Sequence, residues 1–185
     1  MEALFVSTAV VALAEMGDKT QLLAFVLAAK FKRPWPILLG ILVATLANHA
    51  LAGVVGVWLA GLVAPDTLRW IVAASFIGFG LWALVPDKLE GSPEDLAASV
   101  FLTTLVAFFL VEMGDKTQLA TVALAARYQA LALVVAGTTL GMLLANAPAV
   151  WLGEKLSRVV DMRVMRFVAA GSFVLLGVVT LLVRA

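Results

Sequence analysis

The chain alternates between long apolar stretches and short segments that carry charges, prolines and glycines. Each stretch has about the 20 residues that an α-helix needs to cross a bilayer, and the polar segments are suited to the membrane surfaces. The pattern therefore predicts an all-α membrane protein. Its six helices are expected at about residues 2–29, 36–61, 67–86, 98–126, 130–152 and 164–184.

The second half of the sequence repeats the first at an offset of 97 residues. The octapeptide Glu-Met-Gly-Asp-Lys-Thr-Gln-Leu occupies residues 15–22 and recurs unchanged at 112–119. Each half holds three predicted helices, an odd number, so the second half must enter the membrane in the opposite direction. We predict two inverted three-helix repeats of the kind found in secondary transporters. Their expected bounds are 1–86 and 98–185, with a polar linker at 87–97.

Each octapeptide places charged side chains in the middle of an apolar stretch. An ionisable group in the hydrocarbon core costs about 2.5 to 3.5 kcal/mol on insertion scales, so it needs a partner and marks a functional site. Sites in inverted repeats lie near the bilayer midplane, where the halves meet. We therefore expect one pocket rich in oxygen ligands, which suits a hard divalent cation such as Ca²⁺ or Mn²⁺. The predicted ligands are Glu15, Asp18, Gln21, Glu112, Asp115 and Gln118.

The charges of this pocket favour exchange of one kind of cation for another. Four carboxylates and the ammonium groups of Lys19 and Lys116 sum to minus two, which one divalent cation or two protons would cancel. A site that is neutral with either occupant lets the two compete. This argument holds only if both lysines stay beside the pocket rather than extend to an interface. The alternative is that the charges only pair with one another, as Glu15 would with Lys19 one helical turn later.

Other polar side chains admit two interpretations each. On a straight helix Thr20 and Thr117 lie about 140° from the glutamate of their octapeptide. Either their hydroxyls bind a neighbouring helix, or the helix unwinds near the glycine and they join the site. Asn48 and Asn146 either complete the coordination or bond to adjacent helices. His49 either relays protons or packs in the core.

Composition supports the membrane class and excludes several others. Hydrophobic residues make up 63% of the chain and charged residues 14%, against about 25% charged in soluble domains. The absence of cysteine excludes disulfides and thiolate metal sites. We expect no nucleic-acid partner, because there is no basic stripe, and neither enzymatic activity nor a permanently bound cofactor.

Lysines and arginines outside the octapeptides are distributed unevenly. Eight fall on the membrane side that holds the 30–33 connection, and three on the other side. The positive-inside rule places the first side in the cytoplasm. Both termini are therefore predicted to lie outside.

The duplicated motif resembles a known family, the small cation/proton exchangers with two Glu-x-Gly-Asp-Lys/Arg-Thr/Ser motifs, found in the Golgi, chloroplasts and bacteria and grouped within the LysE superfamily. Residues 15–20 and 112–117 both match in full. The resemblance implies exchange of Mn²⁺ and Ca²⁺ for protons, with export of Mn²⁺ across the bacterial inner membrane. The family's functional residues carry over to Glu15, Asp18, Glu112 and Asp115, and its motif hydroxyls to Thr20 and Thr117.

Two other functions are compatible with the sequence. One is a LysE-like exporter of an amino acid or other organic cation, and the other is a membrane assembly factor that transports nothing. The sequence leaves open which metal is physiological, how many protons are exchanged, and whether the chain acts as a monomer or a homodimer.

Overall fold

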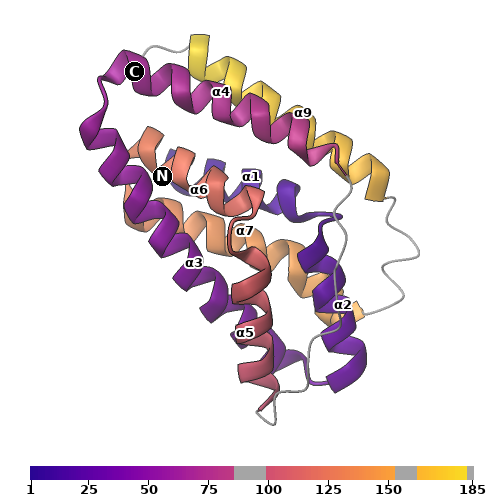
Figure 1. The fold of residues 1–185 in the computed structure, drawn as a ribbon. Helices are drawn as coiled ribbons and strands as arrows, with labels where there is room; N and C mark the ends of the chain where they lie inside the picture. The colour runs from indigo at the N-terminus through magenta and orange to yellow at the C-terminus, as the bar shows by residue number, and fades with distance from the viewer. Residues whose placement is uncertain (86–98, 153–161, 183–185) are drawn as a thin grey trace.

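The computed structural model describes residues 1–85, 99–152 and 162–182, and this part of the chain is all-helical, as predicted. The predicted linker at 87–97 and the outermost ends of three predicted helices, at 86, 98 and 183–184, lie outside the described residues. Figure 1 shows the arrangement of the helices. They are α1 (Glu2–Glu15), α2 (Lys19–Phe31), α3 (Pro34–Leu62), α4 (Pro65–Ala83), α5 (Val100–Glu112), α6 (Lys116–Tyr128), α7 (Leu131–Leu152) and α9 (Met162–Leu182).

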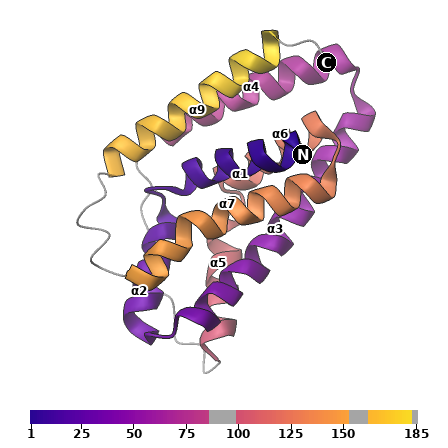
Figure 2. The same cartoon turned by 180° about the vertical axis from the view of Figure 1, so that it is seen from behind.

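The helices expected at 2–29 and 98–126 are each divided into two. The first is interrupted between α1 and α2, and the second between α5 and α6. Gly17 and Gly114 lie in these breaks with φ of 85° and 78°, the left-handed region that glycine enters without a Cβ penalty. The chain changes direction at each break, which both views show (Figures 1 and 2). The sequence left open whether these helices are straight or unwound at the glycine, and the structure shows that the octapeptide ends one helix and begins another.

Contacts between the two halves are reciprocal. Helices α4 and α9 lie side by side (Figures 1 and 2). A Cβ on Gly80 of α4 would lie 2.9 Å from the carbonyl oxygen of Ala170, and one on Gly177 of α9 would lie 3.0 Å from that of Ala73. At the offset of 97, Gly177 is equivalent to Gly80 and Ala170 is equivalent to Ala73, so each contact is the counterpart of the other. Such exchange of partners is what a two-fold relation produces.

The same exchange occurs between two further pairs of helices. Gly40 of α3 lies against the Phe101 carbonyl of α5, and its equivalent Gly137 of α7 lies against the Leu4 carbonyl of α1. These glycines let the helix backbones approach closely, as small residues do in membrane helix packing.

The outer surface is apolar over long stretches of helix. Trp58, Leu144 and Leu175 are more than half exposed on three different helices. A surface of this kind suits lipid rather than water. Among the described residues, α3 and α7 are long and apolar enough to cross a membrane by themselves.

Candidate functional site

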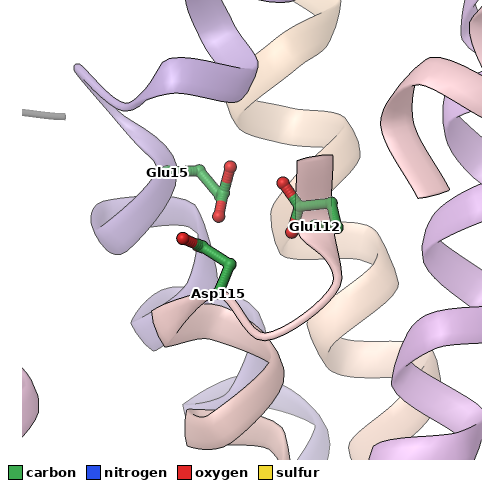
Figure 3. Close-up of side chains that lie close together, drawn as sticks. All are labelled: Glu15, Glu112 and Asp115. Carbon is green, nitrogen blue, oxygen red and sulfur yellow. The ribbon is translucent and has the colours of Figure 1, made fainter. Parts of the chain in front are cut away.

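The two breaks bring three acidic side chains together at the centre of the fold. Glu15 ends α1, Glu112 ends α5, and Asp115 immediately precedes α6. Their carboxylates converge in Figure 3, and one oxygen from each lies within 4.8 Å of the others. The side chains are buried, with exposures of 0%, 0% and 2%. The octapeptides thus meet at one buried site, and we refer to these three residues as the acid cluster.

The breaks also direct helix ends at the acid cluster. The last carbonyl groups of a helix have no partner within the helix, and the C-terminal end carries a partial negative charge. Because Glu15 and Glu112 are the last residues of α1 and α5, two such ends accompany the carboxylates. The N-terminal ends of α2 and α6, which carry partial positive charges, begin beside them at Asp18 and Asp115. The preference of the site for positive charge therefore comes from the carboxylates rather than from the helix ends.

The aspartates and lysines of the octapeptides pair across the two halves. Lys19 Nζ lies 2.7 Å from Asp115 Oδ1, and Lys116 Nζ lies 2.9 Å from Asp18 Oδ1. The lysine side chains are 22% and 5% exposed, respectively. Both lysines therefore stay beside the pocket. Lys19 reaches the aspartate of the other half rather than Glu15 at the end of α1.

The threonines join the site because the helices unwind. Thr20 Oγ1 donates a hydrogen bond to Glu15 Oε2. Thr117 Oγ1 donates to Glu112 Oε2 at 3.1 Å and lies 3.5 Å from Asp115 Oδ2. Of the two interpretations of the threonines, unwinding near the glycine is the correct one.

The glutamines stabilise the breaks. The backbone N–H of Gly17 donates to Gln21 Oε1 at 3.0 Å, and that of Gly114 donates to Gln118 Oε1 at 2.7 Å. Gln21 Nε2 also donates to the carbonyl oxygen of Ala145 in α7 at 3.1 Å. The structure thus directs the glutamine oxygens to the backbone of the breaks.

The asparagines lie on α3 and α7, beside the helices that carry the acids. Asn48 Nδ2 donates to the carbonyl oxygen of Phe109 in α5 at 3.1 Å, and Asn146 Nδ2 donates to that of Met142 in its own helix at 3.0 Å. Within the described residues, their Oδ1 atoms are buried and accept no hydrogen bond. The same holds for Oε1 of Glu15 and of Glu112. Buried polar atoms in native proteins usually have a partner, and exceptions require an explanation such as an ion.

His49 lies on α3 next to Asn48 and is fully buried. Neither of its ring nitrogens has a hydrogen-bond partner within the part of the chain that the structure describes. Proton relay through this residue stays a prediction.

A cavity of about 630 Å³ lies at the far end of α6 from the acid cluster. Its lining includes Glu2, Asp66, Arg69, Arg127 and Tyr128, and the Tyr128 hydroxyl donates to Glu2 Oε1 at 3.2 Å. This cavity was not predicted from the sequence, because its lining comes from the ends of helices that are far apart in the chain. The only signal was the gathering of these helix ends on one predicted membrane side.

The family model for the "Divalent cation/proton antiporter GDT1" matches residues 3–91 and 100–185. The chain belongs to the GDT1 family. It is therefore a membrane antiporter that exchanges a divalent cation for protons, and not an enzyme. The resemblance drawn from the duplicated motif is confirmed.

Three relatives match along nearly the whole chain. A Vibrio cholerae protein named "Putative manganese exporter" is 46% identical over 97% of this chain and 90% of its own length. GDT1-like protein 5 of Arabidopsis thaliana is 29% identical over 95% of this chain and 93% of its own. GDT1-like protein sll0615 of Synechocystis is 26% identical, with 92% of both chains covered. No solved structure matches the chain.

Proposed function

We propose that this GDT1 antiporter exports Mn²⁺ from the bacterial cytoplasm, across the inner membrane, in exchange for protons, and that the acid cluster binds both. The observation that carries the proposal is the meeting of three buried carboxylates, two of which have an oxygen without a hydrogen-bond donor among the described residues. The similarity to the Vibrio cholerae protein supports manganese as the cation.

The ligands in this proposal are oxygen atoms. Carboxylate, hydroxyl and amide oxygens suit Mn²⁺ and Ca²⁺ better than softer metals. The acid cluster supplies the negative charge, while the hydroxyls are held beside it by hydrogen bonds to the glutamates. The proposed ligands are Glu15, Asp18, Thr20, Glu112, Asp115 and Thr117, with Gln21, Gln118, Asn48, Asn146, Lys19 and Lys116 at the margin of the site.

Competition between the cation and protons follows from the charge of the pocket. The crossed ion pairs keep Lys19 and Lys116 beside the four carboxylates, so the sum of minus two applies. One divalent cation or two protons restore neutrality, which a low-dielectric interior strongly favours. The protein then changes between its inward-open and outward-open forms with either the divalent cation or two protons bound.

We further propose that the chain crosses the membrane six times as two inverted repeats, 1–86 and 98–185, around the 87–97 linker. The reciprocal contacts between the halves support this arrangement, and discontinuous helices at the midplane are typical of such transporters. With both termini outside, the cavity beside Glu2 and Tyr128 opens on the outer face and serves as the exit vestibule. One chain supplies both halves of the site, so the proposal needs no second copy.

Proteoliposomes test the proposal. With the purified protein and a Mn²⁺-sensitive dye inside, an inside-acid pH gradient should drive Mn²⁺ uptake, and Mn²⁺ uptake should release protons in turn. Flux that ignores the pH gradient and survives Glu112→Gln would reject it. The second candidate, a LysE-like exporter, predicts instead that excess lysine or arginine competes with Mn²⁺.

A further inference from the structure

We propose that Lys19 and Lys116 are positioning residues that compete with the transported cation for the aspartates of the opposite half. Cation binding would then loosen the ion pairs that tie the two halves together. The inference rests on the proposed function, because it takes the acid cluster as the site where the cation binds.

Asp115 takes part in two arrangements at once. One of its oxygens belongs to the acid cluster with Glu15 and Glu112, and its Oδ1 lies 2.7 Å from Lys19 Nζ. A divalent cation held by the cluster would place two positive groups on one carboxylate. Because like charges repel strongly at such separations in a buried site, the cation and the lysine compete for Asp115.

Both ion pairs connect the same two helices. Lys19 is the first residue of α2 and Lys116 the first of α6, while Asp18 and Asp115 occupy the N-cap positions immediately before them. The pairs therefore hold together the N-terminal ends of α2 and α6, which would otherwise repel through their partial positive charges. Weakening a pair frees these ends, which belong to different halves, to separate.

The two lysines differ in exposure in the way that this role requires. The Lys19 side chain is 22% exposed and that of Lys116 only 5%. Lys19 can therefore move toward the outside of the protein when it leaves Asp115. It is also the lysine whose partner belongs to the acid cluster, so the Lys19–Asp115 pair should open first.

Amine labelling of the wild-type protein tests this without any substitution. Purified protein is treated briefly with acetic anhydride, with and without saturating Mn²⁺, and modification at each lysine is measured by peptide mass spectrometry. We expect Mn²⁺ to raise labelling of Lys19 several-fold and to leave Lys30, at the other end of α2, unchanged. Unchanged or lower labelling of Lys19 would overturn the inference.

Substitution provides an independent test. In Lys19→Gln, the affinity for Mn²⁺ should rise about tenfold, because a competing charge beside the cluster is gone. Exchange should nevertheless slow. In the step where the protein changes between its inward-open and outward-open forms without the cation, Asp115 would have no cationic partner. Lys19→Arg should keep the wild-type exchange rate, and Lys30→Gln is the matched control on the same helix. Lys116→Gln repeats the test should Lys19→Gln not fold.

A weaker Mn²⁺ affinity in Lys19→Gln, or exchange at the wild-type rate, would overturn the inference. A purely structural lysine would lower affinity and rate together. Failure of the proposed function is distinguishable, because the wild-type protein would then neither bind Mn²⁺ nor exchange it for protons.

Discussion

The two octapeptides have the same sequence and fold in the same way, yet they have different surroundings. In both, the glycine adopts a left-handed conformation, the glutamine accepts a hydrogen bond from that glycine, and the threonine donates one to the glutamate. These features join residues only four or five positions apart. They are therefore properties of the octapeptide itself.

The surroundings differ because packing is not the same on the two sides. Met113 is 57% exposed, whereas Met16 is half-buried. Gln21 reaches across to α7, and Asp18 Oδ1 accepts from the Lys19 N–H at 2.8 Å, a cap that the side chain of Asp115 does not make. The comparison separates what the octapeptide determines from what its neighbours determine. If the halves are the inverted repeats proposed above, one half moves against the other during transport, and unequal surroundings are then expected in any single conformation.

The largest expected effect tests the shared part of the comparison. Glu15→Gln and Glu112→Gln should each abolish Mn²⁺/H⁺ exchange in proteoliposomes, and to the same extent, because both glutamates belong to one cluster. Even a residue that only supports a metal ligand is worth about 10- to 100-fold in affinity. Loss of a proposed ligand should therefore cost at least about 100-fold in exchange rate. Lys30→Gln, at an exposed side chain near the end of α2, is the control. One active glutamate variant would show that the cluster does not act as a unit.

Next in size is the effect of the break glycines. Gly17→Ala and Gly114→Ala place a Cβ on a left-handed residue, which costs about 1 to 2 kcal/mol each, and should shift thermal unfolding in detergent accordingly. No atom lies within 4 Å of a Cβ built on Gly114, so its loss would come from the backbone alone. Gly171→Ala is the matched control, since this α9 glycine is equally uncrowded and has no positive φ. Equal stability of all three variants would mean that the left-handed conformation at Gly17 and Gly114 does not require glycine.

The sequence predicted the all-helical class and the meeting of the octapeptides, because duplication of charged residues within apolar stretches leaves few alternatives. It did not decide whether the helices break. A single glycine inside a helix costs only about 1 kcal/mol, and the glutamate, methionine and lysine of each octapeptide are good helix formers. The break depends on the hydrogen bonds of Gln21 and Gln118, which exist only once the backbone has turned.

The ion pairs between the two halves could not be predicted from the sequence, for a different reason. On a continuous helix, Glu15 and Lys19 are suitably spaced to pair, and nothing in the sequence favours Asp115 as the partner. That choice of partner depends on the distance between the N-terminal ends of α2 and α6. Such a distance is set by packing between halves and not by spacing along the chain.

A smaller effect is expected from the motif hydroxyls. Thr20→Val and Thr117→Val keep the side-chain shape but remove the donor to the glutamate. The apparent affinity for Mn²⁺ in exchange should fall about tenfold, in line with other groups that orient a metal ligand. Thr20→Ser and Thr117→Ser should restore it, and wild-type affinity in the valine variants would leave the hydroxyls without a part in the site.

The smallest effect addresses the difference between the copies. Gln21→Met removes the bond to Gly17 and also the bond to Ala145 in α7, whereas Gln118→Met removes the bond to Gly114. Because Gln21 is buried and Gln118 is half-buried, the first change should lower the free energy of unfolding by about 1 kcal/mol more than the second, which is the typical net worth of one hydrogen bond. Denaturation of both variants in the same detergent measures this difference. Equal losses would mean that the two glutamines experience the same average surroundings in solution, so that the inequality belongs to one conformation of the transport cycle and not to the protein as a whole.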